Sequence, residues 1–372
     1  MKHLHFTQSV EALQGGGLGK AAIDLHKAFL SVGTESFFVS TREGEHSPSI
    51  PNSFLGQRTG ISKFFYSSEL KDRAPGWGQE TDIFHGHGFY VYPNWLLGKQ
   101  ARENSKMLIY HPHGFLEPWI LARSRIPKRV AHFLFENQNF KYAQLWRALT
   151  TKEADQIRAC GIETPIVVAA NGIHLKEYDR VVSESLTPKK QKRRILFLAR
   201  IHPKKGLKIL LEIWPEIQSN YVDWELIVAG PDEGGHRTEL EQLSESLEIS
   251  STVKFIGTVS GDEKLAWLQS SDLFILPSYS EGFSVAVLEA MTCRKPVLIT
   301  TGCNFPEVAT ENAGWICEAD HSSLKATLDS ALTMPETELQ NMGQSGRALV
   351  ENKYTWTKIA ETIIDAANEQ RR

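Results

Sequence analysis

Short apolar runs alternate with helix-period segments along the whole of this 372-residue chain, and this alternation limits the fold more than any other feature. A strand, a helix and another strand in succession are typical of parallel sheets with crossover helices. The series runs twice, with a polar break between the two runs. A chain of this length also exceeds what one hydrophobic core usually organises. We therefore predict an α/β protein with two Rossmann-like domains of similar size.

The predicted domains are residues 1–175 and residues 194–355, joined by a linker at 176–193. The linker is placed where the periodicity fades and where five of six consecutive residues, 189–194, are basic. Two such domains would face each other across a cleft, and open parallel sheets bind ligands at the C-terminal ends of their strands. The functional residues are therefore expected in the loops that follow strands.

The individual elements follow from the same periodicity. Strands are predicted in the first half at His3–Thr7, Glu35–Ser40, Asp82–His85, Met107–His111, Arg147–Thr150 and Pro165–Ala169, with a helix at about Lys20–Leu30. The stretch 41–78 is rich in Ser, Gly and Pro and is predicted to be a long irregular excursion. In the second half, strands are predicted at Arg194–Ala199, Trp224–Ala229, Thr252–Ile256, Leu273–Leu276 and Pro296–Thr300, and helices at Gly206–Gln218, Arg237–Leu247, Gly261–Ser270 and Phe283–Cys293. Three further helices are expected to close the chain.

Composition narrows the function class and the compartment. The chain has 41 Lys+Arg against 44 Asp+Glu, a net charge of −3, so no nucleic-acid partner is expected. The four cysteines form no CxxC pair and are interpreted as reduced thiols of a cytoplasmic protein. The first residues lack the apolar stretch of a signal peptide, and no apolar run approaches the ~18–20 residues of a membrane helix. Any membrane contact, on the inner face, is therefore expected to be peripheral.

The most informative motif spans residues 278–291 and contains two carboxylates eight positions apart, Glu281 and Glu289. It follows an apolar strand and continues into a helix. With Glu281 in the loop and Glu289 two turns into the helix, the N–H groups near Phe283–Val285 form a helix N-terminus suited to a diphosphate. Glu289 is then placed for a ribose diol and Glu281 for hydroxyls of a transferred group. The alternative is a helix with an acidic first turn and one exposed glutamate.

A second motif, residues 197–207, also leads from a strand into a loop and a helix. Arg200 supplies a fixed fork of donors and Lys205 a compact charge, both at the C-terminal end of a strand. Together they are suited to neutralising a diphosphate as it leaves. The alternative is a basic loop in contact with solvent, which is weaker because Arg200 directly follows an apolar strand.

The first half contributes glycines and histidines. Gly15–Gly19 is predicted to be a strand-to-helix loop that lets the backbone approach a phosphate or a sugar. It does not fit the dinucleotide GxGxxG spacing, and no acidic residue closes the next strand, so a nicotinamide enzyme is a poor interpretation.

Two HxH pairs, His85/His87 and His111/His113, each stand at a strand end. Such pairs occur in metal enzymes, but no nearby carboxylate or cysteine completes a ligand set, so no metal site is predicted. His113 is the best candidate for a contact with a sugar donor. His85 and His87 are expected to cap a strand or to touch an acceptor.

These motifs resemble those of the glycogen-synthase-like group of retaining glycosyltransferases, also called family-4 or group-1 transferases, which have the GT-B fold. The resemblance rests on the E-x7-E motif, Arg200 with Lys205-Gly206, the glycine loop, and Asn171-Gly172-Ile173 before the linker. It covers essentially the whole chain. The sequence Tyr354-Thr355-Trp356 before the last helix is also similar, which implies that helix 356–372 returns to the first domain.

The resemblance implies a role for each matched position. Arg200 and Lys205 would bind the donor diphosphate, Glu281 would meet sugar hydroxyls, and His113 would contact the sugar from the other domain. The remaining donor-binding positions would contact the ribose, the base, the distal phosphate and the sugar: Gly16, Gly17, Ile256, Gly282, Phe283, Ser284, Val285 and Glu289. The family uses no metal ion and no cofactor, which agrees with the missing DxD-type motif.

The implied function is retaining transfer of a hexose, with UDP-glucose as the favoured donor, to a saccharide or lipid-linked acceptor in polysaccharide or glycoconjugate biosynthesis. The basic segment 121–130, near Trp119, would dock on an anionic membrane surface, although a solvated helix entry explains it equally well. Three alternatives stay open: a nucleotide-sugar epimerase on the same fold, a phosphorylase-like protein, and a non-catalytic nucleotide-sugar-binding protein.

Overall fold

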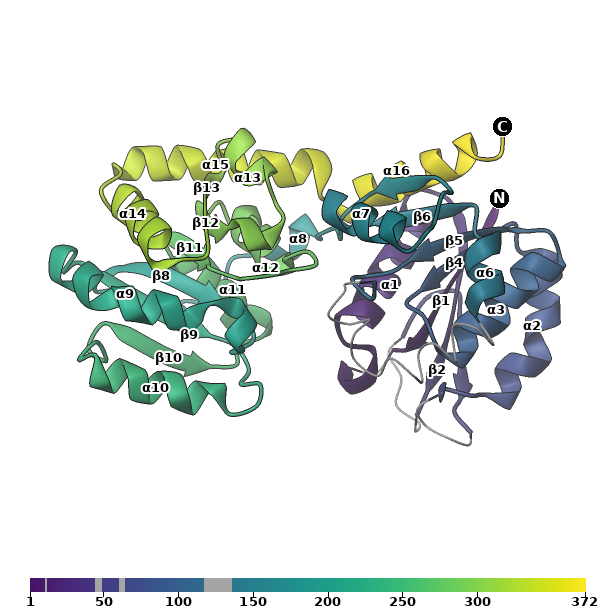
Figure 1. Cartoon of the computed structure of the whole chain (residues 1–372), viewed down its shortest axis with the longest axis horizontal. Coiled ribbons are helices and arrows are strands. Elements are labelled where there is room, and N and C mark those ends of the chain that lie inside the picture. Colours follow the sequence, from purple (N-terminus) through teal and green to yellow (C-terminus); the bar gives the residue numbers. More distant parts are fainter. Residues whose placement is uncertain (11, 44–48, 60–63, 117–135) are drawn as a thin grey trace. The chain divides into compact units, whose positions relative to one another are not determined.

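The chain forms two compact units in the computed structural model, which describes residues 1–10, 12–43, 49–59, 64–116 and 136–372. One unit consists of Met1–Gly172 with Trp356–Arg372, and the other of Ile173–Thr355. Each unit holds one sheet with helices packed against it (Figure 1). The predicted α/β class with two Rossmann-like halves is confirmed.

The first unit is built on a seven-stranded parallel sheet in the order β3-β2-β1-β4-β5-β6-β7. Its strands are β1 (Lys2–Ser9), β2 (Glu35–Arg42), β3 (Ser53–Gln57), β4 (Ile83–His87), β5 (Met107–His111), β6 (Leu145–Ala148) and β7 (Ile166–Val168). Its helices are α1 (Ala12–Ser31), α2 (Ser68–Glu80), α3 (Tyr92–Glu103), α6 (Asn137–Tyr142), α7 (Thr151–Ala159) and α16 (Trp356–Glu369). The strand order reverses between β1 and β4, which is the position where such sheets bind ligands.

The central strands of this sheet are buried on both faces, as parallel strands are when helices cover them. All five residues of β4 and of β5 are buried. On one face, α1 and α16 share a core that includes Phe29 and Ile363. Gly172 allows the chain to approach the start of α16, because a Cβ atom there would lie 2.6 Å from the backbone of Trp356.

Two predictions for the first unit are wrong. The glycine loop at Gly15–Gly19 does not exist, because α1 already begins at Ala12 and contains these residues, Gly16 and Gly17 among them. Gly19 shows what one of these glycines does: a Cβ atom there would lie 2.9 Å from the carbonyl oxygen of Ser9, so the glycine lets the helix pack closely against the end of β1. What Gly16 and Gly17 bind stays a prediction.

The stretch 41–78 is also not an irregular excursion, because it contains the edge strand β3 and most of α2. Pro75 lies inside α2. Because proline usually ends or kinks a helix, its presence argued against a helix in this part of the sequence. Ser67 caps α2 by accepting a hydrogen bond from the N–H of Leu70. The basic segment 121–130 lies outside the described residues.

The second unit is built on a six-stranded parallel sheet in the order β10-β9-β8-β11-β12-β13. Its strands are β8 (Arg193–Leu198), β9 (Trp224–Ala229), β10 (Val253–Gly257), β11 (Leu273–Leu276), β12 (Val297–Thr300) and β13 (Gly314–Cys317). Its helices are α8 (Leu175–Tyr178), α9 (Leu207–Asn220), α10 (His236–Ser246), α11 (Gly261–Ser270), α12 (Val285–Thr292), α13 (Glu307–Thr310), α14 (His321–Leu332) and α15 (Glu336–Lys353). The predicted strands and helices of this half are confirmed to within a few residues, whereas β13 was not predicted.

The segment after α8 is tied to the body of the second unit by Arg347 of α15. Its guanidinium makes a bidentate pair with Asp179, at 2.8 and 2.9 Å, and donates to the carbonyl oxygen of Thr292 at 2.9 Å. Arg347 is buried, and a two-pronged pair of this kind fixes both distance and orientation. Residues 176–179, at the start of the segment predicted to be a linker, therefore pack as part of the second unit.

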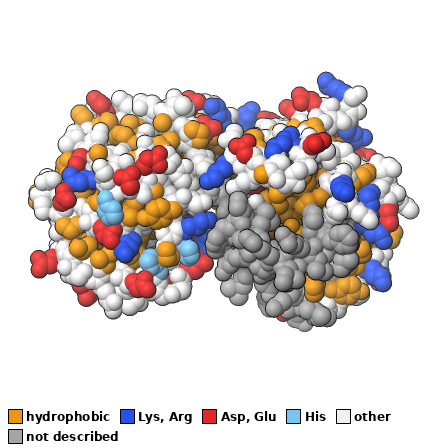
Figure 2. All heavy atoms as spheres, in the orientation of Figure 1, with side chains coloured by type: hydrophobic (Ala, Val, Ile, Leu, Met, Phe, Trp, Pro, Cys, Tyr) orange, Lys and Arg blue, Asp and Glu red, His pale blue; other side chains and the backbone are white. Residues whose placement is uncertain are grey.

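The surface charge of the second unit and the hydropathy of the helices concern the expected lack of a nucleic-acid partner and the expected peripheral membrane contact. On the face shown in Figure 2, acidic and basic side chains of the second unit are interspersed. Among the described helices, none combines the length and the apolar character that crossing a bilayer requires.

Candidate active site in the second unit

The loops after β8, β9 and β11 pack against one another through glycines. Gly206, after β8, has a left-handed φ of 69°, and a Cβ atom there would lie 1.9 Å from the carbonyl oxygen of Pro277, after β11. Gly230, after β9, has φ 142°, and a Cβ atom there would lie 1.8 Å from the carbonyl oxygen of Ala199. Only glycine fits both the backbone angles and the space. The strand-end loops are thereby gathered at one edge of the sheet.

Hydrogen bonds then lock these loops together. The N–H of Tyr279 and the hydroxyl of Ser278 both donate to the carbonyl oxygen of Lys204, at 2.9 and 3.0 Å. Thr300, at the end of β12, donates to the carbonyl oxygen of Ser278 at 2.5 Å. The loop around Glu281 is therefore held from the β8 side and from the β12 side, and the backbone of the site is preorganised.

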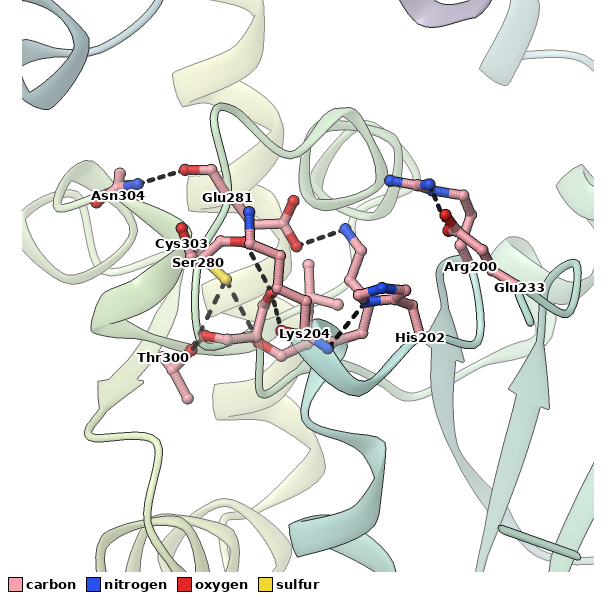
Figure 3. A network of polar contacts seen from close by, with 12 residues as sticks. Arg200, His202, Lys204, Glu233, Ser280, Glu281, Thr300, Cys303 and Asn304 are labelled. Atoms are coloured by element: carbon pink, nitrogen blue, oxygen red, sulfur yellow. Dashed lines mark hydrogen bonds and ion pairs between the residues drawn. The ribbon is translucent and has the colours of Figure 1, made fainter. Parts of the chain in front are cut away.

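Lys205 and Glu281 form a partly buried ion pair at the centre of this arrangement. The Lys205 Nζ atom lies 2.6 Å from Oε1 of Glu281, and the two side chains are 15% and 10% exposed. The backbone N–H of Glu281 donates to the carbonyl oxygen of Gly302 at 2.8 Å. The carbonyl oxygen of Glu281 accepts from the side-chain amide of Asn304 at 2.5 Å (Figure 3). The structure thus brings together two of the predicted site residues, and their charges neutralise each other.

Arg200 lies at the rim of the site and is paired differently. Its guanidinium contacts Glu233, from the loop after β9, at 2.5 Å (Figure 3). Both side chains are exposed, at 62% and 46%, so this pair is worth little and is easily exchanged for another anion. Between Arg200 and Lys205, His202 accepts a hydrogen bond from the N–H of Lys204 at 3.0 Å and caps the short 3₁₀ helix Pro203–Lys205.

The helix after Glu281 begins where the E-x7-E motif predicts. Helix α12 starts at Val285 with Ser284 as its N-cap residue, and the Ser284 side chain makes no capping hydrogen bond. The backbone N–H groups of the first turn are therefore available to an anion. Phe283, in the same loop, stacks with Tyr354 at a ring distance of 6.0 Å, and Gly282 precedes it.

Glu289 lies within α12 and is buried, so it is not the exposed glutamate of the alternative interpretation. Its Oε1 atom accepts from the hydroxyl of Tyr178 at 2.7 Å and from Lys264 at 2.6 Å. Burial and the neighbouring carboxylate raise the pKa of the Tyr178 hydroxyl, which keeps it a neutral donor. The carboxylate is thus oriented by two side chains that sequence reasoning did not identify.

The predicted base-binding edge is the sheet edge formed by β10. Ile256 lies in this strand and is half-buried, and the carbonyl oxygen of its neighbour Gly257 accepts from the N–H of Gly230 at 2.8 Å. Arg237 reaches the carbonyl oxygen of Phe255 at 3.4 Å. The edge strand is therefore connected to the same loops as Arg200.

His113 lies in the first unit, directly after β5, and has a left-handed φ of 53°. Such a conformation is strained for a residue with a side chain, costing of the order of 1 kcal/mol or more, and strained residues gather at functional sites. The N–H of the following Gly114 donates to the buried carboxylate of Glu153 at 2.5 Å. His85 and His87 are buried inside the sheet, so the expectation that they touch an acceptor is wrong.

A cavity of about 390 Å³ in the first unit was not predicted from the sequence. Aromatic and aliphatic side chains and one carboxyl group line it: Phe64, Tyr66, Tyr90, Val91, Tyr92, Trp95 and Glu136. Glu136 is fully buried and accepts from the N–H of Tyr90 at 3.0 Å and from the hydroxyl of Tyr110 at 3.2 Å. Burial raises the pKa of Glu136 to about 7. The cavity is suited to an apolar group.

Several site residues escaped sequence reasoning because nothing local marks them. Glu233, Lys264, Asn304 and Tyr178 reach the site from four different elements. Asn304 carried a usable signal, since it follows an apolar strand directly after a Thr-Gly-Cys turn. Lys264 lies in a helix and pairs with a carboxylate 25 positions away, which no local pattern reveals.

These features define an α/β protein with a cluster of charged side chains at the strand ends of its second sheet. The family model for "Glycosyl transferases group 1" matches residues 180–368, about half of the chain. The chain belongs to the group 1 glycosyl transferases.

Two curated relatives illustrate the range of similar proteins. A phosphatidyl-myo-inositol mannosyltransferase of Propionibacterium freudenreichii is 29% identical over 58% of this chain and 54% of its own length. A D-inositol 3-phosphate glycosyltransferase of Catenulispora acidiphila is 25% identical over 94% of this chain and 89% of its own length. The match thus spans about half the length of the first relative and most of the second.

Solved structures show the same fold over the whole chain. HepE of Anabaena in complex with UDP superposes with a TM-score of 0.78 at 19% identity, covering 99% of this chain and 100% of that chain. Sucrose-phosphate synthase from Thermosynechococcus elongatus gives a TM-score of 0.74 at 15% identity, with 99% of both chains covered. The fold is GT-B, as the resemblance implied.

Proposed function

We propose that this protein is a retaining, metal-independent glycosyltransferase that moves a hexose from a nucleotide sugar to a saccharide or lipid-linked saccharide acceptor. The observation that carries the proposal is the partly buried Lys205–Glu281 pair, held 2.6 Å apart beside the open first turn of α12. A cation, a carboxylate and several backbone N–H groups together can bind the diphosphate and the sugar of a nucleotide sugar. The diphosphate is held by the first and the last of these, and the sugar hydroxyls by the carboxylate.

The proposed reaction needs no nucleophile from the protein. The acceptor hydroxyl attacks the anomeric carbon on the face from which the nucleotide leaves, and the departing phosphate oxygen takes the hydroxyl proton. Lys205 and Arg200 stabilise the negative charge that grows on the leaving diphosphate. Preorganised groups of this kind are typically worth ~3–4 kcal/mol each in the transition state.

UDP-glucose is the donor we favour. The HepE neighbour is described with UDP and with UDP-glucose bound, which supports a uridine nucleotide. GDP-mannose ranks next, because a curated relative is a mannosyltransferase that uses GDP-mannose. Glu289, oriented by Tyr178 and Lys264, would accept from the ribose hydroxyls, and the backbone of β10 at Ile256 would contact the base.

For the acceptor, we propose a molecule with an apolar part that enters the cavity around Trp95 and Glu136. A lipid-linked saccharide fits this description, and two curated relatives are named for acceptors built on phosphatidylinositol. The largely aromatic lining would accept a hydrocarbon more readily than a charged group. We place the protein in polysaccharide or glycoconjugate biosynthesis, in the cytoplasm or at the inner face of the membrane.

A thermal-shift screen of nucleotide sugars tests the proposal first, because a preferred donor stabilises the folded state by mass action. We expect UDP-glucose to raise Tm more than UDP, GDP-mannose or UDP-N-acetylglucosamine at equal concentration. Incubation with the stabilising donor and a lipid-linked saccharide, followed by NMR of the product, should then show an unchanged anomeric configuration. Conversion of the donor without any acceptor would indicate an epimerase, and binding without any turnover would indicate a non-catalytic protein.

A further inference from the structure

Six histidines of the first unit form two hydrogen-bonded rows across the neighbouring strands β1, β4 and β5. In the first histidine row, Nδ1 of His5 contacts Nε2 of His87 at 3.2 Å, and Nδ1 of His87 contacts Nε2 of His113 at 3.0 Å. The second histidine row consists of His3, His85 and His111. Its Nδ1-to-Nε2 distances are 2.9 Å and 3.1 Å. The rows follow from the H-x-H spacing, because alternate residues of a strand lie on the same face.

All of these imidazoles are held in the neutral form by burial, which lowers the pKa of each ring. A neutral imidazole has one N–H donor and one acceptor nitrogen. When one ring donates to the next, it therefore decides which nitrogen of that ring carries the proton. Each row has only two possible states, one for each direction of donation.

The inner end of the first histidine row selects its direction. Nε2 of His5 is buried and has no hydrogen-bond partner within the part of the chain that the structure describes. The edge contact with Phe29, at a ring distance of 4.7 Å, supplies no oxygen or nitrogen acceptor. Burying an N–H donor without a partner costs more free energy than burying an unprotonated nitrogen without a partner. Nε2 of His5 is therefore unprotonated, and Nδ1 of His5 carries the proton. Donation then runs from His5 to His87 and from His87 to His113.

The second histidine row runs the opposite way by the same argument. Here Nδ1 of His111 is the buried atom without a partner among the described residues. His111 therefore donates through Nε2 to His85, and His85 donates through Nε2 to His3. The two rows lie in contact, since His5 stacks on His85 at 4.2 Å, and opposite directions of donation oppose their dipoles.

The first histidine row ends at the surface. His113, at its outer end, is half-buried, whereas His5 and His87 are buried. With Nε2 occupied as an acceptor from His87, the proton of His113 must reside on Nδ1. The ring therefore meets an incoming molecule as a hydrogen-bond donor, and its partner must be an acceptor atom such as a sugar or phosphate oxygen.

We propose that His5 and His87 are positioning residues that fix His113 as its Nδ1–H tautomer, so that His113 donates to an oxygen of the nucleotide sugar. The choice of ligand rests on the proposed function. The tautomer rests on the histidine geometry alone, and the two parts are tested separately.

The tautomer is measured on the full chain with ¹⁵N-labelled histidine. Long-range ¹H–¹⁵N spectra distinguish a protonated from a bare ring nitrogen, and single substitutions assign the signals. At pH 7.5 we expect a protonated Nδ1 on His113 and a protonated Nε2 on His111. A protonated Nε2 on His113 would overturn the proposal, whether or not the protein binds a nucleotide sugar.

The ligand contact is tested with a matched set of variants. In His87→Asn the amide nitrogen takes the place of Nδ1 and can still donate to His113, whereas in His87→Gln it takes the place of Nε2 and cannot. We expect His87→Gln to raise the KM for the donor roughly three- to tenfold, the value of one hydrogen bond, and His87→Asn to rescue most of that loss. His85→Asn and His85→Gln, equally buried on the same strand, are the controls.

The outcomes separate a positioning role from a structural one. A loss of affinity confined to His87→Gln supports the proposal. Equal losses in His87→Asn, His87→Gln and both His85 variants would mean that burial alone matters and would overturn it. If no nucleotide sugar shifts Tm in the wild-type protein, the proposed function fails, while the tautomer measurement still decides the role of His5 and His87.

Discussion

The Nζ atom of Lys205 lies 2.6 Å from Oε1 of Glu281, although the two residues are 76 positions apart in the chain. The contact joins the loop after β8 to the loop after β11. Because both side chains are largely buried, neither charge is fully solvated, and each depends on the other. A bound diphosphate would compete for the ammonium and release the carboxylate toward sugar hydroxyls. The resting pair thus resembles a site that holds its two functional groups in place until the donor arrives.

Replacing Lys205 by alanine should lower turnover by at least roughly tenfold, because one preorganised charge is lost from the transition state. The measurement is kcat with saturating donor, together with circular dichroism to show that the protein stays folded. Lys208→Ala is the matched control, since this lysine lies in the next turn of the chain but is 63% exposed and pairs weakly with Glu212 at 3.8 Å. Near-normal turnover in Lys205→Ala would remove Lys205 from the site.

Glu289→Gln should weaken donor binding more than it slows turnover. The carboxylate is buried and oriented by Tyr178 and Lys264, and a neutral amide accepts weaker hydrogen bonds from a ribose diol. Since a charge-assisted hydrogen bond is worth about 1.5–3 kcal/mol, we expect the KM for the donor to rise roughly tenfold or more. Glu263→Gln, exposed on α11, should leave KM unchanged. An unaltered KM in Glu289→Gln would place the ribose elsewhere.

Gly206→Ala should destabilise the second unit and displace the loop that carries Lys205. Its φ of 69° is unfavourable for alanine, and the new Cβ atom would lie 1.9 Å from the carbonyl oxygen of Pro277. Gly234→Ala isolates the backbone effect, because Gly234 has φ 79° but open space around it. We expect Gly234→Ala to cost about 1 kcal/mol in the free energy of unfolding and Gly206→Ala clearly more. Equal costs in urea titrations would show that the close approach to Pro277 is unimportant.

The stability of the first unit should fall as the pH drops below about 6.5. Burial lowers the pKa of seven histidines of this unit, to about 4 for His3 and to about 3 for His113. The group comprises His3, His5, His26, His85, His87, His111 and His113. Below pH 6.5 the histidines of the unfolded chain bind protons, whereas the same histidines in the folded unit stay neutral. Acid therefore favours unfolding. Each histidine contributes up to about 1.4 kcal/mol per pH unit.

Urea unfolding between pH 8 and pH 5 measures this loss. The free energy of unfolding should be nearly constant from pH 8 to pH 7 and then decline with a slope that reports several protons. A flat profile down to pH 5 would mean that the buried histidines are charged in the folded state.

The sequence predicted the strands of both sheets well because parallel strands are buried on both faces and appear as apolar runs. β9 and β11 were predicted with the residues at which the structure has them. The failures have local causes. β13 was not predicted because it is short and half-buried. Helix α2 was not predicted because it contains Pro75, and the start of α1 was predicted to be a loop because it contains four glycines. In α1 and α2, the glycines and the proline are residue types that usually indicate loops, so the sequence pattern did not predict a helix there.

For the candidate site, the sequence alone determined the residue types at the strand ends: Arg200, Lys205, the two glutamates and the helix start between them. The tertiary structure decided which of these charges meet. In the structure Lys205 pairs with Glu281, and Arg200 pairs with Glu233. Glu289 accepts hydrogen bonds from Tyr178 and Lys264, and six histidines form two hydrogen-bonded rows. The physical reason is that spacing fixes only neighbours along one element, whereas a parallel sheet brings together strand ends that lie tens of residues apart in the sequence.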